Sequence, residues 1–186
     1  MTQQKPRAKL TVDDYMNTPD DVRYQLIDGE LILAPSPTDR HQTVLFKLAV
    51  LLDQHVSASG IGKVWIAPFD VVFPDREVYQ PDILFVSNER REIITEANIQ
   101  GAPDLVVEIL SPSTQQYDRG YKREVYAERG VREYWIVDPG AGTVEVLSAA
   151  DGDWEAEVTF SREDALVSRL LPGLSIELGP VFEVAK

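Results

Sequence analysis

Two acidic residues lie inside apolar stretches in the middle of the chain. Asp82 precedes the apolar residues 83–86, and Glu108 lies within the largely apolar residues 105–110. Side chains of a β-strand alternate between its two faces, so both faces of the second stretch are apolar, which is typical of a strand covered on both sides. An ionised carboxylate at position 108 is therefore costly unless a cation compensates it.

The two acids suggest a metal site if they lie side by side. At a separation of about 4 Å, two carboxylates repel by about 4 kcal/mol at an effective dielectric constant of about 20. A divalent metal ion between them would reverse the sign, and carboxylate oxygens are ligands that Mg²⁺ prefers. A structural explanation fits the pattern too, in which Asp82 caps the start of a strand and Glu108 pairs with an arginine. The pattern alone leaves both explanations open.

Composition narrows the class of protein. The sequence has 186 residues, a formal net charge of −13 and no cysteine. The lack of cysteine excludes disulfides and thiolate metal sites and agrees with a cytoplasmic location. No apolar run approaches the ~20 residues of a membrane span, so we expect no membrane contact. The negative charge disfavours broad non-specific binding of DNA, which depends on Lys and Arg, although a basic patch can be local.

The hydrophobic pattern predicts an α/β fold with a mixed sheet and a β-hairpin at each end. Residues 1–186 are expected to form one domain, with residues 1–9 as a flexible tail. Helices are predicted at residues 11–16, 39–56 and 115–129, strands at 63–67, 69–73, 82–86, 104–110 and 133–138, and a loop at 74–80. The hairpins are residues 23–33, turning at Asp28-Gly29, and 143–160, turning at Asp151-Gly152. A strand, a helix and a further strand in succession imply a right-handed crossover with parallel pairing.

Several segments, in this order, resemble the Uma family of restriction-endonuclease-like proteins. They are residues 24–30, Pro35-Ser36-Pro37 with His41, Gln80-Pro81-Asp82, residues 107–114 and residues 130–139. The paired acids are similar to those of the PD-(D/E)XK nucleases, whose core runs helix, three strands, helix, strand. The resemblance covers the chain from Tyr24 to about Val146. It implies a restriction-endonuclease-like core that hydrolyses DNA phosphodiester bonds with Mg²⁺ or Mn²⁺.

The resemblance also assigns roles to particular residues. It implies that Asp82 and Glu108 bind the metal together with the main-chain carbonyl of Ile109. The family-wide motif has a lysine two residues after the second acid, where this chain has Leu110. The resemblance suggests that the lysine has moved to the next helix, as Lys122. A plainer explanation for Lys122 is an i, i+4 ion pair with Asp118, and the two roles are compatible because Asp118 can position the lysine.

Other candidates are accessory. His41 could contact the site or a phosphate, and Glu30 could be a further acid near the metal. Each also has a structural explanation. His41 could lie on the surface or pack against the fold, and Glu30 could simply close the Asp28-Gly29 hairpin. Tyr126 and Trp135 are expected to serve in packing.

Two classes of function follow. The first is a metal-dependent endonuclease, and the second is a catalytically degenerate member of the same fold that binds a partner or self-assembles. A nuclease needs a basic rim, for which the candidates are Arg40, Lys47, Arg119, Lys122 and Arg123. A homodimer is plausible because cutting two strands needs two sites, and residues 143–160 are a candidate surface for it.

Overall fold

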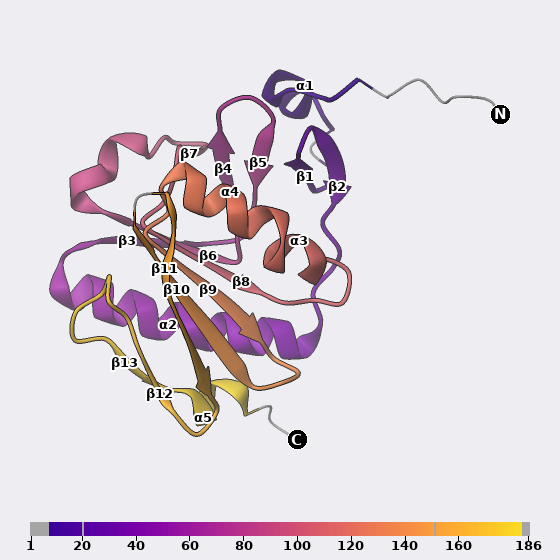
Figure 1. Ribbon diagram of the computed structural model, residues 1–186. Helices are drawn as coiled ribbons and strands as arrows, with labels where there is room; N and C mark the ends of the chain where they lie inside the picture. The colour runs from indigo at the N-terminus through magenta and orange to yellow at the C-terminus, as the bar shows by residue number, and fades with distance from the viewer. Residues whose placement is uncertain (1–7, 20, 151, 184–186) are drawn as a thin grey trace.

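The structure is a computed structural model that describes residues 8–19, 21–150 and 152–183. Its strands form a six-stranded sheet, a five-stranded sheet and a two-stranded ribbon, with helices packed on them (Figure 1). The predicted α/β class with mixed sheets is confirmed. Most of the predicted N-terminal tail lies outside the described residues. Within the described ranges, no helix is long and apolar enough to cross a bilayer.

The N-terminal helix and hairpin belong to the layer of the five-stranded sheet, which also contains strands from the middle of the chain. Helix α1 (Val12–Met16) begins with a capping box between Thr11 and Asp14. Strands β1 (Tyr24–Ile27) and β2 (Glu30–Leu33) form the predicted hairpin, in which Asp28 and Gly29 both take positive φ. The five-stranded sheet has the order β2-β1-β5-β4-β7, with β4 at Asp70–Phe73, β5 at Glu77–Tyr79 and β7 at Asn98–Gln100.

Two segments differ from the prediction. The predicted loop 74–80 contains β5, and its polar Glu77 is buried because its carboxylate accepts hydrogen bonds from the Asp28 N–H and the Tyr79 hydroxyl. A strand this short, with a charged residue satisfied by distant partners, has no local hydrophobic signal. The polar stretch after strand β6 (Ile83–Ser87), for which the sequence indicates at most a helical turn, forms the 3₁₀ segment η1 (Asn88–Ile93) and then β7.

The six-stranded sheet carries the two acids. Its order is β11-β10-β9-β8-β6-β3. The strands are β3 at Gly62–Ile66, β6 at Ile83–Ser87, β8 at Leu105–Ile109, β9 at Glu133–Asp138, β10 at Thr143–Ala150 and β11 at Asp153–Ser161. Strands β8 and β9 are parallel, as the crossover requires, and the other neighbours are antiparallel. The second predicted hairpin is confirmed as β10–β11, although Asp151 of its turn lies outside the described residues.

Helices cover both faces of this sheet (Figure 1). On one face, α2 (Asp39–Ser59) buries Val44, Leu48 and Leu52 against strand residues such as Val107. The other face carries α3 (Gln115–Arg119) and α4 (Tyr121–Arg129). Close to α2 lie β12 (Ala165–Val167), β13 (Ser175–Glu177) and α5 (Leu178–Phe182). The sheet is therefore apolar on both faces, as the pattern around Glu108 predicts.

The predicted helix 115–129 is interrupted. Gly120 adopts φ −111° and ψ −106°, which is not helical, and so separates α3 from α4. A Cβ at this position would lie 2.8 Å from the main-chain oxygen of Gln116, so glycine suits the close approach. The predicted end of the helix at Gly130 is confirmed, with φ 90° in the left-handed region. The break leaves Asp118 and Lys122 on different helices but still in contact.

Candidate active site

The register of β6 and β8 brings the two acids together. Ile83 pairs with Val107 in antiparallel register, so the next position outward places Asp82 opposite Glu108. Residues directly opposite one another in an antiparallel pair have Cβ atoms about 4.5–5.5 Å apart and share one face. Both residues line a pocket of about 260 Å³ at this end of the sheet. The structure thus brings together the two acids that the sequence proposes as metal ligands.

Five parts of the chain form the walls of this pocket. They are the start of α2, the beginning of the β1–β2 hairpin, the loop 34–38, the loop 111–114 and the region around α3 and the start of α4. The end of β3 and Gln80 also contribute. Thr38 caps α2 by accepting a hydrogen bond from the His41 N–H, which fixes His41 at the beginning of the helix. Ile109, Asp118 and Lys122 also border the pocket.

Asp82 is held at the end of β8. Main-chain N–H groups of a strand alternate between its two neighbours, and that of Leu110 donates to Val137 of β9. The N–H of Ile109 therefore faces β6, where Oδ2 of Asp82 accepts its hydrogen bond at 2.7 Å. The carboxylate takes the place of a main-chain acceptor, and this fixes its direction.

His41 lies against the same carboxylate. Its Nε2 is 3.3 Å from Oδ2 of Asp82, and its side chain is 11% exposed. Burial acts to lower the pKa of His41, but the Asp82 carboxylate and the nearby main chain of Ile109 outweigh it, so the pKa is raised. Among the described residues its buried Nδ1 has no hydrogen-bond partner. His41 is thus placed at the site, as one of its two alternatives expects.

Glu108 is held by two side chains of α4. Its Oε1 accepts hydrogen bonds from Nζ of Lys122 at 2.9 Å and from the Tyr126 hydroxyl at 2.8 Å. Burial raises the pKa of Glu108 to about 8; Lys122 opposes the rise, and the charges of Asp118 and Asp82 add to it. Without a further cation, this carboxyl group therefore retains its proton to unusually high pH.

Lys122 lies between two carboxylates. Its side chain is 2% exposed, and Nζ lies 2.9 Å from both Glu108 Oε1 and Asp118 Oδ1. The contact with Asp118 is an ion pair without hydrogen-bond alignment, since Oδ1 has no hydrogen-bond partner among the described residues. Burial acts to lower the pKa of Lys122, but the two carboxylates outweigh it and raise the pKa, so the ammonium stays charged. The predicted ion pair with Asp118 is present, and Lys122 also contacts Glu108.

The cluster has a surplus of negative charge when all its acids are ionised. Asp82, Glu108 and Asp118 supply three negative charges against one positive charge on Lys122, which leaves two, or one if His41 is protonated. A negative surplus in a largely buried site favours a further cation.

The free oxygens of the two acids fit a hard cation. No described residue donates a hydrogen bond to Oδ1 of Asp82 or to Oε2 of Glu108. The described part of the chain contains no group of three or more His, Cys, Asp or Glu placed to hold a metal ion. Mg²⁺ needs only one or two carboxylates because it keeps several waters. The residues therefore fit Mg²⁺ or Mn²⁺ better than a metal that needs a full cage of side chains.

Other predicted residues lie elsewhere. Glu30 is exposed on β2 outside the pocket, and its carboxylate lies 3.5 Å from Nζ of Lys9. Arg40 is exposed at the start of α2 and does not line the pocket. The structure therefore does not bring Glu30 to the acid pair.

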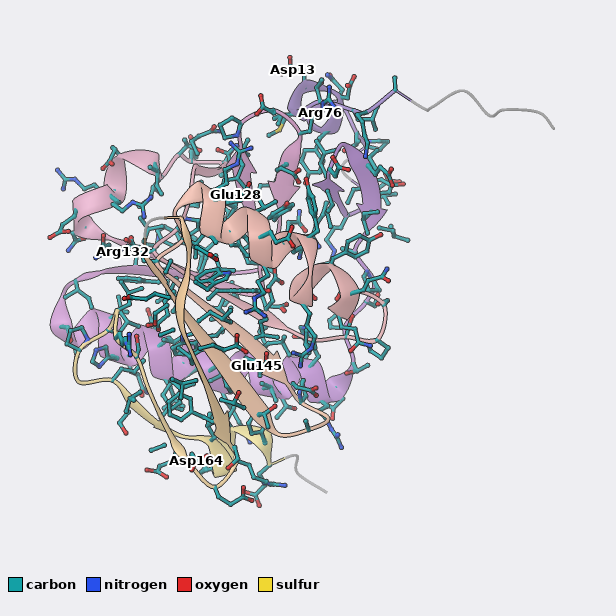
Figure 2. The ribbon with its side chains drawn as sticks, in the orientation of Figure 1. Asp13, Arg76, Glu128, Arg132, Glu145 and Asp164 are labelled. Atoms are coloured by element: carbon teal, nitrogen blue, oxygen red, sulfur yellow. The ribbon has the colours of Figure 1, made fainter. Side chains whose placement is uncertain are left out.

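Most of the predicted basic rim is engaged. Lys47 donates to the main-chain carbonyls of Pro180 and Glu183. Arg119 pairs with Glu145 on β10, and Glu145 is labelled in Figure 2. Arg123 pairs with Glu157. With Lys122 buried as well, these side chains offer little positive charge to a nucleic acid.

Two features of the site are absent from the sequence prediction. Tyr126 is buried, as expected for packing, but its hydroxyl also holds Glu108. Its signal is the four-residue spacing from Lys122, which places both on one side of α4. Gln25 of β1 and Arg23, which directly precedes β1, form a wall of the pocket. Local sequence gives no signal for this contact, because it depends on how the two sheets pack.

Comparison with known proteins identifies the protein family. The model of the Uma2 family, described as “Putative restriction endonuclease”, matches residues 12–179, and the chain belongs to this family. The chain is 26% identical over 182 residues to “Uncharacterized protein slr1290” of Synechocystis sp., covering 95% of this chain and 93% of that protein.

A solved structure shares the fold. It is the crystal structure of a “putative nuclease belonging to DUF820” from Anabaena variabilis ATCC 29413. The TM-score is 0.78 with 23% sequence identity, and the match covers 93% of this chain and 97% of that chain. The resemblance to a restriction-endonuclease family is thus confirmed at the level of family and fold.

Proposed function

We propose that the chain is a metal-dependent endonuclease that hydrolyses DNA phosphodiester bonds with Mg²⁺ or Mn²⁺. The main support is the register of β6 and β8, which sets Asp82 opposite Glu108 at a pocket, with the Lys122 ammonium on Glu108. Membership of a family described as “Putative restriction endonuclease” supports the same class of reaction.

Asp82 and Glu108 would hold the metal through the oxygens that no described residue occupies, with the carbonyl of Ile109 as a third ligand. When bound, the metal supplies Lewis-acid activation of the phosphate and of the attacking water. The ligand set is rigid, because Glu108 and Ile109 lie in β8 and the Asp82 carboxylate is fixed by the Ile109 N–H.

Lys122 and Tyr126 orient Glu108. Both donate to Oε1, which leaves Oε2 to face the pocket. The ammonium has three N–H groups, of which one donates to Glu108, and Lys122 lines the pocket, so a further N–H is available there. It can donate to the attacking water or to a phosphate oxygen as charge grows in the transition state. Asp118 keeps the lysine charged and in place.

Plasmid nicking in the presence of Mg²⁺ tests the proposal. Asp82→Ala and Glu108→Ala should abolish nicking, because each removes a metal ligand, while circular dichroism shows an intact fold. Glu30→Ala serves as the matched control, since this carboxylate lies outside the pocket and its loss should leave nicking unchanged. Nicking that persists equally in both site variants would come from a contaminating nuclease and would refute the proposal.

One observation favours the degenerate alternative. The chain has a net charge of −13, and Arg119 and Arg123 are paired with acids. A protein that binds a partner or self-assembles without cleavage would never nick DNA. Its candidate contact surface is the hairpin β10–β11, where Val158 is 45% exposed.

A homodimer is expected for both functions, since cleavage of two strands needs two sites and self-assembly needs a second copy. Light scattering at several protein concentrations tests whether the homodimer forms.

A further inference from the structure

The pocket has a wall that none of the assigned roles uses. It is formed by Gln25 of β1 and by Arg23, which directly precedes this strand. The Arg23 carbonyl accepts a hydrogen bond from the Ala34 N–H, so the extended pairing with the β2 side of the hairpin reaches Arg23. Residues two apart in extended backbone point to the same face, so both side chains are directed to the same side. Asp82, Glu108 and Lys122 line the same pocket.

Gln25 has a donor without a partner. Its side-chain oxygen accepts a hydrogen bond from the main-chain N–H of Gln80 at 3.2 Å, which fixes the orientation of the amide. The NH₂ group at the other side of the amide makes no hydrogen bond to any described residue. Gln25 is only 7% exposed. The NH₂ group is accessible at the pocket wall and not fully buried, so it can donate a hydrogen bond to an acceptor on a ligand.

Arg23 is an available cation. It is exposed, and within the described ranges its guanidinium forms no ion pair or hydrogen bond. This distinguishes it from Arg119 and Arg123, which have carboxylate partners. A guanidinium presents a planar fork of donors that matches two oxygens of a phosphate group.

We propose that Arg23 and Gln25 form a phosphate-binding wall that takes the non-bridging oxygens of a backbone phosphate of the substrate strand. A phosphate that enters a pocket with surplus negative charge needs donors on another side, and these two residues provide a charged and a neutral one. The inference rests on the proposed function in taking a nucleic acid as the ligand. The phosphate-binding wall differs from the predicted basic rim, because the phosphate contact comes from the beginning of the β1–β2 hairpin and not from the helices.

Few phosphate contacts give a weak dependence on salt. Each neutralised phosphate of duplex DNA contributes a slope of about −0.9 to a plot of log K against log salt concentration. With Arg23 as the main cation of this wall, the wild-type slope is small, and removing the charge reduces its magnitude by about 1.

Binding under non-cleaving conditions tests the inference. A short fluorescently labelled DNA duplex is titrated with protein in Ca²⁺ in place of Mg²⁺, and anisotropy gives Kd at several salt concentrations. Arg23→Gln should raise Kd about tenfold and flatten the salt dependence, because a charge-assisted contact is lost. Arg23→Lys should restore the salt slope but only part of the affinity, since an ammonium cannot bind in a forked geometry. Mn²⁺ affinity, measured by calorimetry, should be the same in all three proteins.

A matched control is Arg76→Gln. Arg76 is exposed on the hairpin between β4 and β5, beside α1 (Figure 2), and does not line the pocket. Its loss should change neither Kd nor salt slope. If Arg23→Gln behaves like Arg76→Gln while the wild type cleaves DNA, the phosphate-binding wall is refuted and the proposed function stands. If the wild type binds DNA through Arg23 without ever cleaving it, the phosphate-binding wall stands and the proposed function is refuted. A wild type that does not bind the duplex refutes both.

Discussion

Asp82 and Glu108 are opposite one another where β6 begins and β8 ends, yet different parts of the chain hold their carboxylates. Oδ2 of Asp82 is fixed by the main-chain N–H of Ile109, whereas Oε1 of Glu108 is fixed by Lys122 and Tyr126. Each acid therefore has one oxygen held and one free. The free oxygens belong to neighbouring positions on two strands, so changes in the holding residues should alter metal binding in predictable ways.

Metal binding should depend on pH through Glu108. Its pKa is raised to about 8, mainly by burial, so below that pH the metal-free protein holds a proton that a metal ion must displace. We expect the affinity for Mn²⁺ to fall as the pH is lowered from 8, by at most about tenfold per pH unit for one proton. Calorimetry in two buffers with different ionisation enthalpies measures the released proton directly.

The stability of the metal-free protein should also depend on the protonation of Glu108. An acid whose pKa is higher in the folded chain than its ordinary value of 4.5 stabilises the fold at low pH. This contribution is complete below about pH 4.5 and is lost as the pH rises through about 8. The Tm of the metal-free protein should therefore decrease across this range. His41 acts in the same direction, so Glu108→Gln is the control; an unchanged slope in that variant would assign the effect to His41.

Replacing Lys122 should harm the fold more than replacing its partners. Lys122→Met leaves Glu108 and Asp118 buried without their cation, and breaking a buried pair typically costs about 3–5 kcal/mol of unfolding free energy. The double variant Lys122→Met with Asp118→Asn removes one of the two unpaired charges and should regain much of this loss. Urea denaturation measures both. Nicking activity should stay absent in the double variant, and its return would show that Lys122 is only structural.

Tyr126→Phe should weaken metal binding while the fold survives. The variant removes one of the two donors that direct Glu108, which should lower Mn²⁺ affinity several-fold. Tyr79→Phe is the matched control, because Tyr79 is equally buried and donates to Glu77 at 2.6 Å, another buried acid. Each variant should lose about 1–3 kcal/mol of unfolding free energy. Equal Mn²⁺ affinities in the two variants would show that the hydroxyl of Tyr126 serves only stability.

The sequence predicts the long elements because their patterns are local. Apolar residues at helical spacing define α2, and a continuous apolar stretch defines β8. The short strands β5 and β7 have no such pattern, since their pairing partners supply the burial. The break at Gly120 is also hard to predict, because glycine alone does not distinguish a tolerated helix residue from an interruption.

The site is predictable where side chains are close in sequence. Asp118 and Lys122 are four residues apart, so helical spacing predicts their contact, and the contact is present although Gly120 interrupts the helix between them. The pairing of Asp82 with Glu108 follows only from strand register, which the sequence suggests through family resemblance. Arg23 lies far from both acids along the chain and meets the pocket through the packing of one sheet on another, so no local pattern indicates it.

A buried acid remote from the pocket should affect stability alone. Glu133 on β9 is completely buried, and its carboxylate accepts hydrogen bonds from the Trp135 indole, the Ser168 hydroxyl and the N–H groups of Arg169 and Leu170. In contrast to Glu108, both of its oxygens are occupied by neutral donors. Glu133→Gln places an NH₂ group against these donors and should cost about 1–3 kcal/mol of unfolding free energy.

Variants of Glu133 and Glu108 distinguish a carboxylate that only stabilises the fold from one that binds the metal. Glu133→Gln should leave the Mn²⁺ affinity at its wild-type value, and the exposed Glu163→Gln should change neither affinity nor stability. Urea denaturation and calorimetry on the same samples provide both quantities. If Glu133→Gln reduced Mn²⁺ affinity as much as Glu108→Gln does, burial of a carboxylate in this sheet would be enough to explain the effect. The free oxygen of Glu108 would then no longer distinguish the site, because an acid with both oxygens occupied would behave in the same way.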